Sequence, residues 1–365
     1  MHEELSGVWI MAYTTIDDPS KHFQITLWTG DGSTDHSITN GGNSNLQPDL
    51  VWIKKRNDTD DNIWADTSRG ATKYLVSDNA NTEQTYSGNV KSFDSDGFTV
   101  GDGNQINEGS DTFVGWQWKA NGGTRTTNTE SGDNPGGGYQ ANTTAGFSIV
   151  DYTGTGATGT MAHGLGAVPH VMIVKCRSVG HHWQVYHHKN TSAPETDALK
   201  FNDSNTSNDQ DYWWNDTAPT SSVFTLGNGD SGLNDDGATN IAYLFTEIQG
   251  YSKFGSYTGS GNADGVFNYT GFQPAWVMVK QTTTANRDWR IVDNARDTYN
   301  LSTTELKPNT TGAETTSGMQ LDLLANGFKI RTTSTACNSS SDTYIYMAFA
   351  EHPFVSSEGV PCTAR

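Results

Sequence analysis

The segment Trp28-Thr-Gly-Asp-Gly32 returns twice in the sequence, as Tyr152-Thr-Gly-Thr-Gly156 and Tyr257-Thr-Gly-Ser-Gly261. Each copy ends a short run with the character of a strand. The glycines permit the positive φ angles that a tight turn or bulge requires. A motif that recurs with this spacing indicates one structural unit present three times.

Two further features follow each turn and recur with it. A proline opens an apolar run that ends in lysine six positions later, and a tryptophan comes eight to ten residues after that lysine. Each unit closes on an aromatic run. The proline-led runs are 48–54, 169–175 and 274–280, the tryptophans are Trp64, Trp183 and Trp289, and the closing runs are 113–118, 241–245 and 344–349.

These runs have the properties of short strands. Proline at the first position of a strand removes no ladder hydrogen bond, and the alternating apolar residues place large side chains on one face. The window 317–325 is the best candidate for a helix, or for one more strand. Turn residues every eight to twelve positions favour sandwiches or barrels. The sequence therefore predicts an all-β protein of three tandem β-sandwich (jelly-roll-like) domains.

The repeat positions define the expected domain boundaries. A stretch rich in Gly, Asn and Thr separates the first two repeats, and we expect it to be a flexible tether, whereas the short second junction couples repeats 2 and 3 more rigidly. The predicted parts are an N-terminal arm at 1–19, repeats at 20–120, 145–250 and 251–355, the linker at 121–144 and a C-terminal tail at 356–365.

Composition excludes several classes of protein. The 365 residues are only 33% hydrophobic, but the 11% aromatic content argues against disorder. The net charge is −19, and no Lys/Arg cluster is present that could neutralise phosphates, so we expect neither nucleic acid nor a membrane as partner. The three cysteines form no disulfide framework and no zinc motif, which is typical of a protein made in a reducing cytoplasm.

Five segments carry a family resemblance, at 11–20, 47–54, 68–75, 93–98 and 349–361. They resemble a domain of unknown function that recurs in tail-fibre and other virion structural proteins of bacteriophages, especially marine ones. The resemblance implies a structural component of a virion, made in the host cytoplasm, either an appendage (tail fibre or spike) or a head-decoration protein. Its expected partners are other virion proteins and further copies of itself, with a trimer favoured. Residues before Met11 do not match, and Met11 is the expected natural start.

The most conspicuous candidate site is the histidine-rich stretch 181–188. If it is a strand, His182 and His188 share one face, where imidazoles could bind zinc or respond to pH. The favoured alternative is an exposed strand rim beside Trp183. Two acidic loops, Asp94–Asp96 with Asp102 and Asp230 with 234–236, contain oxygen ligands of the kind that calcium prefers. Their spacing matches no known calcium loop, so we expect solvated turns.

A second candidate is the aromatic triplet Tyr212, Trp213 and Trp214, which lies in a polar region. These rings could form a sugar-stacking platform or a subunit contact, or they could simply pack into a core. No nucleophile elbow, phosphate-binding loop or zinc-protease motif is present. We therefore expect no enzyme, cofactor or metal. The alternatives are an adhesin that binds a host surface glycan and, less favoured, a polysaccharide depolymerase whose carboxylate pair comes from distant loops.

Overall fold

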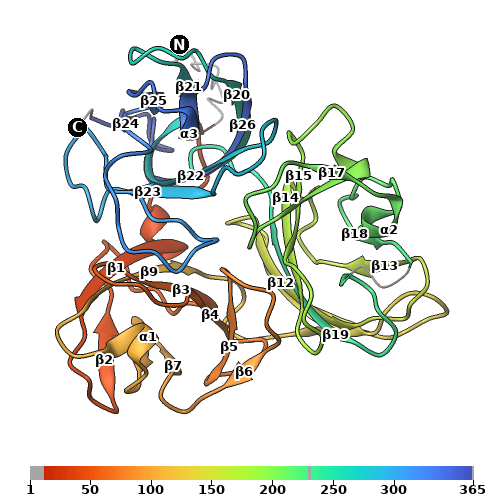
Figure 1. Ribbon diagram of the computed structural model, residues 1–365. Coiled ribbons are helices and arrows are strands. Elements are labelled where there is room, and N and C mark those ends of the chain that lie inside the picture. Colours follow the sequence, from red (N-terminus) through yellow and green to blue (C-terminus); the bar gives the residue numbers. More distant parts are fainter. Residues whose placement is uncertain (1–11, 229–231, 364–365) are drawn as a thin grey trace, which may run out of the picture.

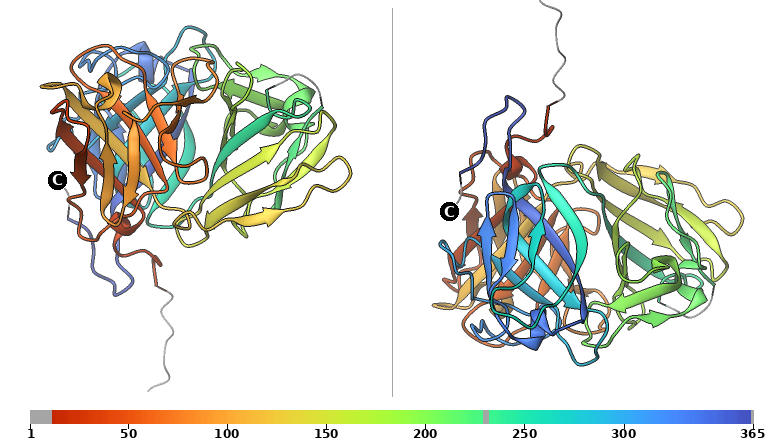
Figure 2. Two further views of the ribbon diagram at one scale, coloured as in Figure 1. Left: turned by 90° about the horizontal axis from the view of Figure 1, so that it is seen from below. Right: turned by 90° about the horizontal axis from the view of Figure 1, so that it is seen from above.

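The computed structural model describes residues 12–228 and 232–363 (Figure 1). Its antiparallel sheets form an all-β, sandwich-type fold, which confirms the predicted fold class. Three groups of strands, one from each repeat, lie around a common centre in Figure 1 and are seen from two further sides in Figure 2. The expected start at Met11 and the acidic residue Asp230 lie outside the described residues.

The main sheet has the same strand order in all three repeats. The first strand pairs with the last, the last with the second, and the second with the third. Repeat 1 contains, in sheet order, β1 (Phe23–Thr29), β9 (Thr112–Trp118), β3 (Leu50–Lys55), β4 (Ile63–Asp66), β5 (Lys73–Val76) and β6 (Gln84–Thr85). Repeat 2 contains β12 (Phe147–Thr153), β19 (Thr239–Phe245), β14 (Val171–Cys176), β15 (Gln184–His187), β16 (Asp197–Lys200) and β17 (Asn208–Asp209). Repeat 3 contains β20 (Ser252–Thr258), β26 (Thr343–Pro353), β22 (Phe272–Gln281) and β23 (Arg290–Asp293).

A smaller sheet packs against one face of each main sheet and completes the sandwich. Helices within the described residues are single turns. The smaller sheets are β2 (His36–Thr39), β8 (Gly97–Val100) and β7 (Val90–Asp94) in repeat 1; β13 (Gly159–Ala162) and β18 (Val223–Leu226) in repeat 2; and β21 (Phe267–Tyr269), β25 (Gly327–Ile330) and β24 (Leu321–Leu324) in repeat 3. The helical turns are η1 (Pro19–Lys21), α1 (Asn104–Asn107), η2 (Pro194–Thr196), α2 (Asp211–Trp214) and α3 (Thr335–Asn338).

The structure corrects the expected flexible tether at 121–144. This segment forms β10 (Thr126–Asn128) and β11 (Gly137–Asn142), and β11 pairs along its whole length with β12, from Gly137 opposite Tyr152 to Asn142 opposite Phe147. The prediction was wrong because backbone hydrogen bonds to an edge strand order a segment without requiring apolar side chains. The window 317–325 contains strand β24 and no helix.

The recurring turn of each repeat is held by one fully buried asparagine. In repeat 1 the side-chain oxygen of Asn107 accepts the N–H of Asp31 at 3.1 Å, and its main-chain oxygen accepts the N–H of Gly32 at 2.9 Å. A Cβ on Gly30 would lie 2.1 Å from a carbonyl oxygen, and Gly32 has φ +65°, so both positions require glycine. Asn234 and Asn338 make the equivalent contacts in repeats 2 and 3.

Both faces of each main sheet are buried. Along β3, Val51 and Ile53 belong to the sandwich core of repeat 1, whereas Leu50 and Trp52 point into a core shared by all three repeats. Because successive side chains of a strand point to opposite faces, burial of both faces explains why these strands are continuous apolar runs. The three sandwiches therefore have separate outer cores and one common inner core.

Candidate functional site

The residues that recur in the three repeats gather where the repeats meet. Trp118, Phe245 and Phe349 occupy the same register position in their main sheets. Their rings contact one another, with centroids 5.6 to 6.2 Å apart. They mark a pseudo-threefold axis, around which the repeats contact one another in pairs. We call each of these three contacts a seam and name it by its two repeats: seam 1–3, seam 2–1 and seam 3–2. The first number is the repeat that contributes a buried lysine to the contact.

One buried lysine crosses each seam. Lys54, Lys175 and Lys280 are the lysines that follow the recurring prolines, and each is at most 1% exposed. Each ammonium donates to a main-chain carbonyl of the neighbouring repeat. The acceptors are Thr311 at 2.8 Å for Lys54, Ala80 at 3.3 Å for Lys175 and Ser204 at 3.3 Å for Lys280.

Burial lowers the pKa of all three lysines to about 8. A buried charge is costly unless polar groups surround it, and here the carbonyls perform that role. The sequence revealed the recurring lysines but not their function, since the acceptors come from loops that do not recur in sequence.

A second donor crosses each seam beside the lysine. The indole Nε1 of Trp183 donates to the carbonyl of Val76 at 2.9 Å, and that of Trp289 to the carbonyl of Lys200 at 3.0 Å. Seam 1–3 has Asn62 instead, whose Nδ2 donates to the carbonyl of Pro308 at 2.8 Å.

Trp64, the recurring tryptophan of repeat 1, is therefore not equivalent to Trp183 and Trp289. Trp64 lies within strand β4 opposite Trp52, whereas Trp183 and Trp289 precede their strands. The sequence spacing aligned Trp64 with them because it falls within two residues of the true equivalent, Asn62.

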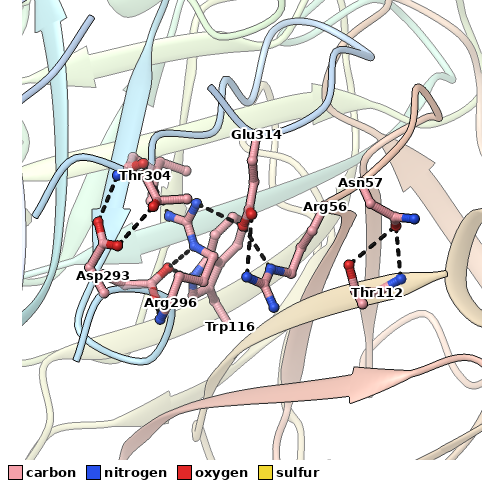
Figure 3. A network of polar contacts seen from close by, with 10 residues as sticks. Arg56, Asn57, Thr112, Trp116, Asp293, Arg296, Thr304 and Glu314 are labelled. Atoms are coloured by element: carbon pink, nitrogen blue, oxygen red, sulfur yellow. Dashed lines mark hydrogen bonds and ion pairs between the residues drawn. The ribbon is translucent and has the colours of Figure 1, made fainter. Parts of the chain in front are cut away.

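Seam 1–3 contains an ionic network in which Arg296 and Asp293 are fully buried and Arg56 and Glu314 partly buried (Figure 3). The guanidinium of Arg56 binds Glu314 at 2.7 Å, and Arg296 lies between Glu314 at 3.4 Å and Asp293 at 2.7 Å. The Asp293 carboxylate also accepts the indole N–H of Trp116 at 3.0 Å. Every charge in this network has an opposite partner, which is the condition under which burial of an ion pair is tolerated.

Seam 2–1 repeats this network with one change. Arg177 binds Glu83 at 2.8 Å, and Arg69 forms an ion pair with the buried Asp66. Here the hydroxyl of Tyr243, at the register position of Trp116, donates to Asp66 at 2.7 Å. The buried aspartate thus accepts its hydrogen bond from a phenol hydroxyl in seam 2–1 and from an indole N–H in seam 1–3.

Seam 3–2 replaces the charged residues with neutral ones. Met347 takes the position of Trp116 and Tyr243 and has no N–H or O–H to donate. His187 takes the position of the two aspartates, its Nε2 lies 3.2 Å from the carbonyl of Tyr346, and its Nδ1 accepts the N–H of Lys189. Burial lowers the pKa of His187 to about 3, so the ring is neutral and donates where an aspartate could only accept.

A family model described as a domain of unknown function, DUF7483, matches residues 18–353. The chain belongs to this family. Among curated proteins and among solved structures, nothing matches the chain. The DUF7483 match includes all three repeats and all three seams, so one family unit corresponds to the whole pseudo-threefold body.

The predicted histidine site of this DUF7483 protein is not an exposed rim. Strand β15 is buried, and His182 and His188 are half-buried with separate partners. The Nδ1 of His182 lies 3.0 Å from the amide nitrogen of Asn202, whereas the Nε2 of His188 lies 2.7 Å from the carbonyl of Phe254 across seam 3–2. Burial lowers the pKa of both rings.

Residues 12–228 and 232–363 bring no three His, Cys, Asp or Glu side chains together in a way that could hold a metal ion. In the first acidic loop, the Asp94 carboxylate accepts the hydroxyls of Ser92 and Thr99 within its own hairpin. The described part of the chain also contains no helix long and apolar enough to cross a membrane.

The aromatic triplet is part of a core. Trp213 and Trp214 are 2% and 1% exposed, and they belong to the sandwich core of repeat 2. The indole of Trp214 donates to the carbonyl of Asp197 at 3.1 Å, and Tyr212 packs edge-on against Trp213. Trp213 and Trp214 therefore follow the packing alternative, because helix α2 turns both indoles inward from a polar segment, whereas Tyr212 is half-buried.

Proposed function

We propose that the protein is a non-enzymatic structural component of a bacteriophage virion. This proposal rests on one observation: the recurring residues make contacts inside the protein. The asparagines that hold the turns, the seam lysines and the closing aromatics are all buried, in the turns, the seams and the cores. They specify how three sandwiches assemble into one rigid body, and a rigid body is what a particle component must supply.

The resemblance to phage tail-fibre and other virion proteins supports the same role, as an appendage or a head decoration. The net charge of −19 keeps such a protein soluble at high copy number. Association with other virion proteins and with further copies of the chain, a trimer in particular, stays part of the proposal. The closing aromatics Trp118, Phe245 and Phe349 pack between repeats of one chain, so an oligomer would use other surfaces.

Immunogold labelling tests this proposal directly. Antibody raised against the folded protein should label purified phage particles at a fixed position, and a reconstruction of the particle should place the three-lobed body there. Label confined to host lysate, with none on intact particles, would contradict a virion role. Release of reducing ends from host polysaccharide by the purified protein would contradict the non-enzymatic assignment.

An adhesin is the second candidate function, and a specific feature of seam 1–3 favours it. That seam contains an open cavity, whereas at the equivalent positions of the other two seams Asp49 binds main-chain N–H groups and His170 packs against His188.

A further inference from the structure

Seam 1–3 contains a cavity of about 360 Å³ between strand β1 of repeat 1 and strands β22 and β26 of repeat 3. This volume lies at the lower end of the range of small-molecule sites, roughly 300–1,000 Å³. Its apolar lining residues are Phe23, Ile25, Ala275 and Ala350. Its polar lining residues are Ser20, Gln24, Asn43, Asn294, Glu351 and His352.

The same position is filled in seam 2–1. Asp49 is the counterpart of Ala275, since each carbonyl accepts the N–H of the residue that follows the seam aspartate. The Asp49 carboxylate accepts the N–H groups of Ala120, Gly122 and Gly123 at 2.7 to 2.9 Å. The segment once expected to be a tether thus closes this seam, and Gln140 of β11 adds a hydrogen bond to Thr67 at 2.7 Å.

Seam 3–2 is filled in a different way. His170 is the counterpart of Ala275, and His188 is the counterpart of Asn294. Their rings pack edge to face with centroids 4.5 Å apart, and His188 bonds to Phe254, the counterpart of Ile25. Two imidazoles therefore occupy the space that an alanine and an asparagine leave open in seam 1–3.

The backbone of seam 1–3 is also irregular at the cavity. The pairing of β22 with β26 shifts twice, so that Ala275 and Glu351 each lack an opposite residue. Both of these residues line the cavity. Bulges re-aim side chains and occur beside binding sites, and here both irregularities coincide with the cavity wall.

We propose that this cavity binds one sugar unit of a neutral glycan. A pyranose presents an apolar face and a ring of hydroxyls that both donate and accept. The lining offers apolar side chains together with the imidazole of His352 and the amides of Asn43 and Asn294, which both donate and accept. The strongly negative protein disfavours anionic ligands at this position. The site is additional to the scaffold role, which does not depend on it.

Saturation-transfer NMR on the full chain tests the proposal, with the methyl glycosides of glucose, galactose, mannose and N-acetylglucosamine as probes. At least one glycoside should bind in the millimolar range. Asn43→Trp places a large ring at the exposed edge of the cavity, and Asn294→Ala removes an amide from its lining; each should weaken binding at least tenfold. The control is Tyr299→Ala, which removes a side chain that is 81% exposed and lies outside the cavity lining.

Three outcomes would overturn the proposal: no signal with any glycoside, binding that survives both cavity variants, or binding lost in the Tyr299 control alone. Unchanged thermal unfolding of Asn43→Trp, an exposed position, shows that a loss of binding is not a loss of fold. Particle labelling is measured independently, so failure of the sugar site leaves the virion role intact.

Discussion

Seam 3–2 has a neutral histidine where the other two seams have an aspartate, so a pair of substitutions can test whether this position depends on its partner in the neighbouring repeat. His187→Asp would recreate the aspartate of the other two seams at a position that is 1% exposed. Met347 cannot donate to it, and Asn190 stands where Arg69 and Arg296 bind their aspartates. An uncompensated buried charge of this kind costs about 3–5 kcal/mol of unfolding free energy.

The second substitution should recover part of that loss. Met347→Tyr restores the donor that Tyr243 supplies to Asp66 at 2.7 Å in seam 2–1. A hydrogen bond to a charged group contributes about 1.5–3 kcal/mol, so the double variant should be more stable than the sum of the two single variants predicts by roughly that amount. Met347→Tyr alone controls for the strain of adding a ring to a packed site.

Urea unfolding of the four proteins at neutral pH measures this coupling. A coupling energy near zero would show that the residue at the aspartate position does not interact with the closing strand of the next repeat. A His187→Asp variant as stable as the parent would show that the position is not buried as the structure indicates. Either result refutes the explanation given for the neutral seam.

Three further predictions follow from buried polar groups. Burial lowers the pKa of the three seam lysines to about 8 in the folded protein, whereas lysines of the unfolded chain keep the ordinary value of 10.5. Between about pH 8 and 10.5 the unfolded chain binds more protons, so the free energy of unfolding should rise with pH in this range and be flat below it. Urea midpoints of the parent should show this slope, and Lys54→Met, Lys175→Met and Lys280→Met should each reduce it. Burial lowers the pKa of His187 to about 3 and also lowers the pKa of His170 and His188. The unfolded chain therefore binds more protons below about pH 6.5, and the free energy of unfolding should fall as the pH drops. The melting temperature of His187→Asn should fall less than that of the parent over that range. Asn338→Ala removes the oxygen that accepts the N–H of Ser260 and the donor to Thr332 and Asn262, and should cost about 2–4 kcal/mol in urea unfolding, whereas Asn262→Ala at an exposed position should cost less than about 1 kcal/mol.

The three seams show how one contact can be met by different chemistry. Two seams use two arginines, a glutamate and an aspartate with a donor from the neighbouring repeat, and the third uses a neutral histidine against a carbonyl. A substitution at one member changes what its partner must be, because a buried acceptor needs a donor. In each seam the donor and the acceptor therefore depend on each other. The pairs are Asp66 with Tyr243, Asp293 with Trp116, and His187 with the Tyr346 carbonyl.

The sequence by itself determined the class of fold, the three repeats and the turn that begins each one. Those features are local: glycine at a positive φ, proline at a strand start and period-two burial leave a pattern in adjacent residues. It also pointed to the seam lysines through their fixed distance from the prolines. The pairing of the linker segment with β12 left no such pattern, since main-chain hydrogen bonds do not depend on side-chain type.

Only the tertiary structure decided what these residues do. Lys54 and its acceptor at Thr311 lie more than 250 residues apart, and the aromatic triplet of repeat 2 turns inward because a core is available on that side of α2. The cavity of seam 1–3 exists because Ala275 is small where its counterparts, Asp49 and His170, engage other groups. Contacts between distant segments depend on how sheets close around a common axis, and no local spacing encodes that closure.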